Sequence, residues 1–178
     1  MCFSVDRAGV LVAGVGLYGG GGDYEFEMEF LDEVSLLTNL FSASIQNVLI
    51  RLFKWFQTES GQPLDDTSRR SRWNVLQVLR GTYGADDCIN EVAEIKFDKP
   101  IPIKPNVRYA VKLRNRGAQY TLSGDNGTSK VKCADGTTFT FSGCAASTNG
   151  TSHFRGQIPK ILYYRFGLTK CLSEFTKV

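Results

Sequence analysis

The stretch that decides the fold is residues 9–30, GVLVAGVGLYGGGGDYEFEMEF. Residues 10–18 are apolar at nearly every position, which is typical of a strand buried on both faces. Residues 24–30 alternate large apolar side chains with glutamate, and this period of two indicates a strand with one buried face. In the first strand, strict alternation predicts one face made of Leu11, Ala13, Val15 and Leu17, and another made of Val10, Val12, Gly14, Gly16 and Tyr18.

The glycines at 14, 16 and 19 fit the G-x-G-x-x-G pattern of dinucleotide-binding loops. That motif requires a helix directly after its last glycine, because the helix N-terminus holds the pyrophosphate. An alternating strand pattern follows instead, so we reject a cofactor site. We expect Gly14 and Gly16 to leave a flat patch on a central strand. We expect residues 19–22 to form a hairpin connection that tolerates positive φ angles.

Further strands are predicted along the rest of the chain, with Gly, Asn and Asp turn signals between them. In one of them, Val107, Tyr109, Val111 and Leu113 face inward while Arg108, Lys112, Arg114 and Arg116 face solvent, opposite Glu25, Glu27 and Glu29. Many short strands with regular turns predict an all-β antiparallel sandwich. The additional strands begin at Trp73, Ala93, Asn106, Thr137 and Ile158.

Residues 34–57 do not fit a strand pattern, because their apolar side chains recur at helical spacing. Recurrent Ser, Thr, Asn and Gln argue against a membrane span and favour an amphipathic helix. Residues 58–72 are polar and read as a flexible linker. We therefore predict one sandwich domain over residues 1–165, with residues 34–72 as a helical insertion and linker in a hairpin connection, and a tail over residues 166–178.

The composition disfavours several function classes. A net charge of +3 does not indicate a nucleic-acid partner. The basic strand also directs Tyr109 away from its cations, whereas single-strand binders place both on one face. Five scattered Cys and one His offer little for a metal site and predict free thiols in a reducing, cytoplasmic compartment. No cleavable leader is evident at the start of the sequence, so we interpret the sequons at Asn126 and Asn149 as Asn-Gly turns.

No catalytic constellation is evident. His153 lies in a turn-rich stretch without a nucleophile elbow nearby, and we interpret it as a surface histidine. Asp86 and Asp87 lack further oxygen ligands at a calcium-binding spacing, and a turn is the better interpretation. We therefore expect no enzyme activity, cofactor or metal in this chain.

Four segments carry a specific resemblance to a known family: residues 2–33, 81–117, 135–144 and 149–165. The chain resembles the PHR domain, above all the tandem PHR domains of the Highwire/Pam/Phr family of E3 ubiquitin ligases. The resemblance implies an antiparallel β-sandwich of Greek-key or jelly-roll-like type. It also implies a non-catalytic interaction module, with ubiquitin transfer carried out by a distant RING region. The family acts in synapse formation and axon growth, and related domains of BTB–kelch-like adaptors are thought to recruit substrates.

Two departures from the family pattern stand out: the chain begins inside the family's domain, so that an N-terminal strand is expected to be missing, and residues 34–57 have no counterpart. We expect an isolated monomer that binds a protein, either a ubiquitylation substrate or a regulator. The alternative is a lectin-like sandwich that binds glycans through aromatic side chains on a concave face. The predicted partner-binding residues are Tyr18, Gly19, Gly20, Gly21, Gly22, His153 and Arg155.

Overall fold

A computed structural model describes residues 1–34, 72–144, 147 and 151–166. The chain divides into two compact units, Met1–Asp32 with Val75–Val178 and Glu33–Asn74, and the account below concerns the first. The predicted helix, linker and tail lie outside the described residues, except for residues 34, 72 and 166 at their ends. No helix in the described part of the chain is long and apolar enough to cross a membrane.

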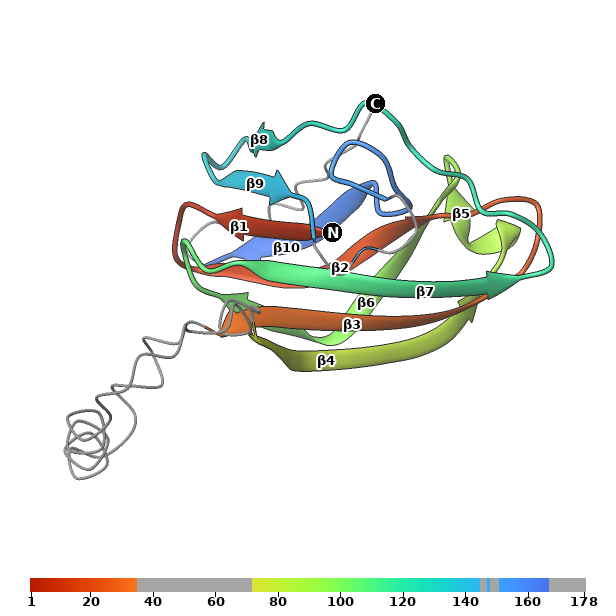
Figure 1. Ribbon diagram of the computed structural model, residues 1–178, viewed down its shortest axis with the longest axis horizontal. Coiled ribbons are helices and arrows are strands. Elements are labelled where there is room, and N and C mark those ends of the chain that lie inside the picture. Colours follow the sequence, from red (N-terminus) through yellow and green to blue (C-terminus); the bar gives the residue numbers. More distant parts are fainter. Residues whose placement is uncertain (35–71, 145–146, 148–150, 167–178) are drawn as a thin grey trace, which may run out of the picture. The chain divides into compact units, whose positions relative to one another are not determined.

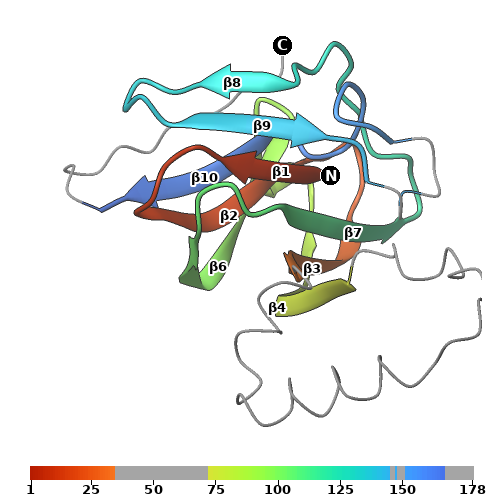
Figure 2. The same ribbon diagram turned by 60° about the vertical axis from the view of Figure 1, so that its left-hand side comes forward.

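Two antiparallel sheets make up the fold (Figures 1 and 2). The six-stranded sheet has the order β4-β3-β7-β1-β9-β8, and the four-stranded sheet has the order β10-β2-β6-β5. A short 3-10 turn, η2 (Ala85–Asp87), precedes β5. The strands are β1 (Cys2–Val5), β2 (Val10–Tyr18), β3 (Tyr24–Val34), β4 (Arg72–Tyr83), β5 (Cys88–Ile89), β6 (Val92–Ile103), β7 (Tyr109–Gly117), β8 (Lys130–Lys132), β9 (Thr138–Ser142) and β10 (Lys160–Arg165).

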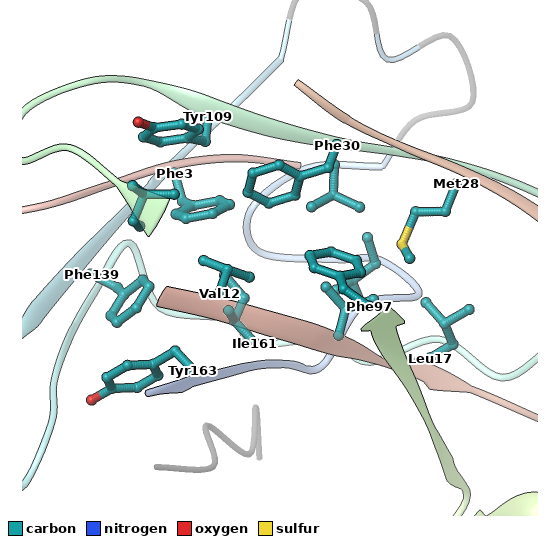
Figure 3. Close-up of a cluster of buried hydrophobic side chains, with 14 of the residues drawn as sticks. Phe3, Val12, Leu17, Met28, Phe30, Phe97, Tyr109, Phe139, Ile161 and Tyr163 are labelled. Carbon is teal, nitrogen blue, oxygen red and sulfur yellow. The ribbon is translucent and has the colours of Figure 1, made fainter. Parts of the chain in front are cut away.

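Aromatic rings fill the space between the sheets (Figure 3). Among the aromatic side chains of the six-stranded sheet, Phe3 on β1 is central. The centroid of its ring lies 5.9–6.1 Å from the ring centroids of Phe30, Tyr109 and Phe139. Two pairs cross between the sheets, Phe30 with Phe97 at 5.5 Å and Phe139 with Tyr163 at 5.0 Å. Buried aromatic side chains bring large apolar areas out of water. The predicted β-sandwich is therefore confirmed.

The predicted faces of β2 are wrong, because the strand contains a β-bulge. Val10, Val12, Val15 and Leu17 all belong to the buried core cluster, although strict alternation places the first two opposite the last two. The pairing of β2 with β6 shifts register between Val12 and Gly14. A bulge adds one unpaired residue, so every side chain beyond it changes face.

Glycine is required at two positions of β2 because neighbouring strands approach it closely. The strand is central, between β10 and β6, as predicted. A Cβ atom at Gly14 would collide with the backbone carbonyl oxygen of Ile95 on β6. A Cβ atom at Gly16 would lie 2.5 Å from Cγ of Lys160 on β10. The flat patch thus accommodates backbone on one side and a lysine stem on the other.

The predicted hairpin over residues 19–22 is wrong. These residues do not close a hairpin, because β2 and β3 belong to different sheets and the loop crosses between them. Their φ angles are not positive either, since among the described glycines only Gly9 and Gly136 have positive φ. Glycine is needed here for space: a Cβ at Gly19 would lie 2.5 Å from the sulfur of Cys88.

The acidic and basic ladders lie on adjacent strands of the six-stranded sheet, as predicted. In the register of β3 with β7, Glu25, Glu27 and Glu29 stand opposite Arg116, Arg114 and Lys112. The Glu29 carboxylate is 3.1 Å from Nζ of Lys112. Glu27 lies 3.8 Å from Arg114 and 3.3 Å from Arg80 on β4. The basic side chains of these pairs are largely exposed and the glutamates are half-buried, so we expect the pairs to contribute modestly to stability.

Asp135, in the turn between β8 and β9, ties the two sheets together. Its carboxylate accepts hydrogen bonds from the backbone N–H of Thr137 at 2.9 Å and from the hydroxyl of Tyr163 on β10 at 3.0 Å. Its carbonyl oxygen accepts a hydrogen bond from Arg165 at 2.7 Å. Burial raises the pKa of Asp135, but the hydrogen bonds from Thr137 and Tyr163 outweigh it, and the pKa is lowered overall.

Replacing Gly14 by alanine is expected to lower the free energy of unfolding by about 1–3 kcal/mol, because the new methyl group meets backbone that cannot rotate away. Gly143→Ala is the matched control, since a Cβ there has nothing within 4 Å. Urea denaturation of both variants checks the expectation. Equal stability of the two variants would show that β6 moves aside without cost.

Charge reversal at Glu27 is expected to change the free energy of unfolding by no more than about 1 kcal/mol, because each exposed cross-strand pair contributes only a few tenths of this. Chemical denaturation of Glu27→Lys in low salt provides the measurement. A loss of several kcal/mol would mean that the carboxylate depends on burial rather than on its exposed partners.

The Asp135→Asn variant is expected to lose about 1–2 kcal/mol of stability at pH 7, because hydrogen bonds to the ionised carboxylate are weakened. The folded pKa lies below the unfolded value, so the stabilisation is complete above the unfolded pKa and disappears as pH falls through the folded pKa. The difference between wild type and variant should therefore shrink below about pH 4. Denaturation at several pH values tests this, with the exposed Asp98→Asn as control.

Candidate functional site

The predicted partner-binding residues lie in two loops that a third loop joins, except Tyr18, which is the last residue of β2. The carbonyl oxygen of Gly19, in the loop between β2 and β3, accepts a hydrogen bond from the backbone N–H of Leu122 at 2.7 Å. Gly124 exchanges backbone hydrogen bonds of 3.0 and 3.1 Å with Gly156, which precedes β10. We call residues 19–22, 118–127 and 151–157 together the loop surface. Sequence reasoning identified the first and last segments and missed the middle one.

Within residues 19–22, Gly19 and Gly20 are packed against neighbouring residues, whereas Gly21 faces solvent. The backbone N–H of Gly19 donates to the carbonyl oxygen of Glu91 at 2.9 Å. A side chain at Gly20 would collide with the hydroxyl of Tyr24, which donates a hydrogen bond to the carbonyl oxygen of Tyr120 at 3.2 Å. Gly21 is exposed, and a Cβ there would meet only the flexible end of Gln119.

Tyr18, at the end of β2, packs against the loop surface and hydrogen-bonds to it. Its backbone N–H donates to the carbonyl oxygen of Gln157 at 3.0 Å, and its own carbonyl oxygen accepts from the hydroxyl of Tyr83 at 3.1 Å. Its ring lies so close to Gly124 that a Cβ on that glycine would be 2.6 Å from the Tyr18 hydroxyl. Half-buried Tyr18 therefore positions two loops.

The segment before β10 is ordered by a serine turn. The hydroxyl of Ser152 accepts hydrogen bonds from the backbone N–H groups of Phe154 at 3.1 Å and Arg155 at 3.3 Å. This turn directs the guanidinium of Arg155 toward Asp125, 3.2 Å away, across largely exposed surface. The ring of half-buried His153 packs against Phe154, with centroids 3.8 Å apart. Arg155 thus links this segment to residues 118–127, and His153 supports Phe154.

Three apolar side chains are exposed on the loop surface, and none of them was predicted. Tyr120 is 100% exposed, Leu122 is 43% exposed and Phe154 is 52% exposed. Large apolar groups in otherwise polar turns are the signal that could have identified them. Tyrosine and phenylalanine offer large contact areas with few rotatable bonds, which suits a protein interface.

The structure confirms the turn interpretation of Asp86 and Asp87. The carboxylate of Asp87 accepts a hydrogen bond from the backbone N–H of Gly84 at 2.9 Å, which closes η2. Within the described ranges, no three His, Cys, Asp or Glu side chains gather in a way that could hold a metal ion.

The cysteines of the described residues form no disulfide. They are Cys2, Cys88, Cys133 and Cys144, whereas Cys171 lies outside the described residues. Burial, aided by a hydrogen bond with Cys144, raises the pKa of Cys2 to about 12, and burial also raises the pKa values of Cys88 and Cys133. Thiols with raised pKa values carry little thiolate at neutral pH and are poor nucleophiles.

The architecture is that of an antiparallel sandwich module with a set of loops gathered against the end of its central strand. Residues 1–164 match the model of the PHR domain, and the chain belongs to this family. It is 43% identical over 165 residues to the E3 ubiquitin-protein ligase MYCBP2 of Danio rerio and 37% identical over 164 residues to the E3 ubiquitin-protein ligase highwire of Drosophila melanogaster. The matches cover 93% and 92% of this chain but only 3% of each ligase.

A more distant relative belongs to a different kind of protein. The BTB/POZ domain-containing protein 6-A of Danio rerio is 26% identical over 163 residues, which are 91% of this chain and 23% of that protein.

Proposed function

We propose that this chain is a non-catalytic protein-binding module of an E3 ubiquitin ligase, and that its loop surface binds a ubiquitylation substrate or a regulator of the ligase. The observation that carries the proposal is the exposure of Tyr120, Leu122 and Phe154 on loops that β2 and the neighbouring strands support. Exposed aromatic side chains on a supported scaffold act as anchors in protein interfaces.

The comparisons support the ligase context. Two relatives are E3 ligases, and the part of each that resembles this chain is about 3% of its length. Such a small share leaves the bulk of each ligase for transferring ubiquitin. Cysteines without a disulfide in the described residues are compatible with a cytoplasmic location. We extend the proposal to the family's role in synapse and axon development, and to an isolated domain that is monomeric.

The glycan-binding alternative is less favoured. A lectin-like sandwich would present aromatic rings on a concave sheet face. The outward face of β3 and β7 instead carries the acidic and basic ladders. The exposed rings of Tyr120 and Phe154 lie on loops.

The double variant Tyr120→Ser/Phe154→Ser tests the proposal. Both side chains are exposed, so the melting temperature should stay within a few degrees, while capture of crosslinked partners from neuronal lysate should fall by about tenfold or more. Phe166→Ser, which removes a ring that is 76% exposed outside the loop surface, is the matched control.

Partners identified by mass spectrometry would then be purified, and their affinities measured for wild type and both variants. Undiminished affinity of the double variant would contradict the loop surface as the binding site. Binding to a glycan array with no protein capture would favour the alternative.

A further inference from the structure

Within the described residues, the two strand orders end in four edge strands, and three of these are no longer than six residues. Unpaired edges expose backbone N–H and C=O groups, and proteins usually protect them by shortness or by charge. β8 is three residues long and has Lys130 and Lys132 at its ends. β5 has two residues and pairs with β6 only at Val92 and Ala93, and the remainder of that edge of β6 carries charged side chains and two prolines. β10 is six residues long and begins and ends with a basic side chain.

The fourth edge strand, β4, is twice as long as β10 and has seven uncharged residues between Arg72 and Arg80. It is twelve residues long, contains no proline and lies at the outer edge of the six-stranded sheet, beside β3 (Figure 1). Val75, Leu76 and Val78 are 40–48% exposed. A long edge that carries aliphatic side chains is suited to strand addition, in which an extended peptide pairs with the sheet.

The outward face of β4 also has a defined charge. Side chains alternate along a strand, so Leu76, Val78 and Arg80 share one face. Arg80 lies on the same face as Glu27, its partner at 3.3 Å, and Arg114 approaches the same carboxylate at 3.8 Å. One carboxylate thus faces two guanidinium groups. A second carboxylate opposite Arg80 would complement the excess positive charge.

This charge distinguishes between the possible occupants of the edge. A second copy of β4 brings arginines and no carboxylate, because its sequence is RWNVLQVLRGTY. Residues 34–57 of the chain repeat at helical rather than strand spacing, and residues 58–71 contain a single aliphatic side chain. Residues 58–71 do contain carboxylates, at Glu59, Asp65 and Asp66, but they lack a second aliphatic side chain. An acidic segment of another protein with two aliphatic side chains supplies both features.

We propose that the open edge of β4 binds, by strand addition, an extended peptide of another protein that carries one carboxylate and two aliphatic side chains at alternating positions. In an antiparallel arrangement the carboxylate comes first in the peptide, opposite Arg80, and the aliphatic side chains follow opposite Val78 and Leu76. This site is separate from the loop surface and does not depend on the function proposed for it.

The experiment uses the full chain and a fluorescein-labelled, end-capped peptide of sequence Ser-Glu-Thr-Val-Thr-Ile-Ser. Fluorescence polarisation should show saturable binding. Two further peptides carry N-methyl groups at alternate residues, one on the odd and one on the even positions. Successive N–H groups of a strand point to opposite sides, so only one methylated peptide should lose binding. Equal binding of both, or no saturation up to millimolar peptide, overturns the proposal.

A charge exchange tests the predicted register. Arg80→Glu should weaken binding of the glutamate peptide by about threefold and strengthen binding of a lysine-substituted peptide by a similar factor, as expected for one cross-strand charge pair. Val78→Lys should weaken both peptides. Thr140→Lys is the matched control, because Thr140 is an exposed strand residue on β9, which has neighbours on both sides.

Two further outcomes are decisive. The double variant Tyr120→Ser/Phe154→Ser should bind the peptide with unchanged affinity, which separates this site from the loop surface. Concentration-dependent dimers that Val78→Lys abolishes would identify a second copy as the occupant of the edge and overturn the proposal. If Arg80→Glu instead bound the glutamate peptide more tightly and the lysine peptide more weakly than wild type does, the assigned register would likewise be overturned.

Discussion

The close approach of β6 and β10 to a strand that lacks side chains at Gly14 and Gly16 is the constraint on which the rest of the structure depends. The two glycines leave room for the Ile95 carbonyl group and the Lys160 stem. Only then can β10 deliver Tyr163 to the aromatic core, where it meets Phe139. Because β2 also holds Gln157 through Tyr18, the same constraint determines where the loops gather. The position of the loop surface therefore depends on how β2 packs in its sheet.

Local pattern was enough to predict the longer strands and the outward ladders, but not the short strands β1, β5 and β8. The alternation in β3 and β7 placed Glu27 and Arg114 outward, and the structure puts them in register. It was not enough for β2, because the bulge near Ala13 depends on how β6 pairs with it. Nor did it show that residues 19–22 cross between sheets, since the choice between a hairpin and a crossover is made by distant strands.

The candidate site was half predicted for the same reason. Glycine-rich and turn-rich segments of the sequence indicated two of its loops. Residues 118–127 belong to the site only because of backbone pairings such as that of Gly124 with Gly156. Tyr18 was expected to contact a partner, yet its ring packs under Gly124. The sequence indicates which segments are loops, but the residues that pack against each loop are determined by tertiary contacts.

The loop surface and the edge of β4 would recognise partners by different physics. Side-chain anchors such as Tyr120 give specificity for a folded surface, whereas an open strand edge binds main chain and tolerates many sequences. Under the proposed function the domain works inside a much longer chain, where tethering raises the effective concentration of a bound partner near the other domains. Modest affinity at each surface is then sufficient, because two weak contacts to one tethered partner reinforce each other. A domain of this size can therefore recruit partners without the large, dry interface that a stable two-protein complex requires.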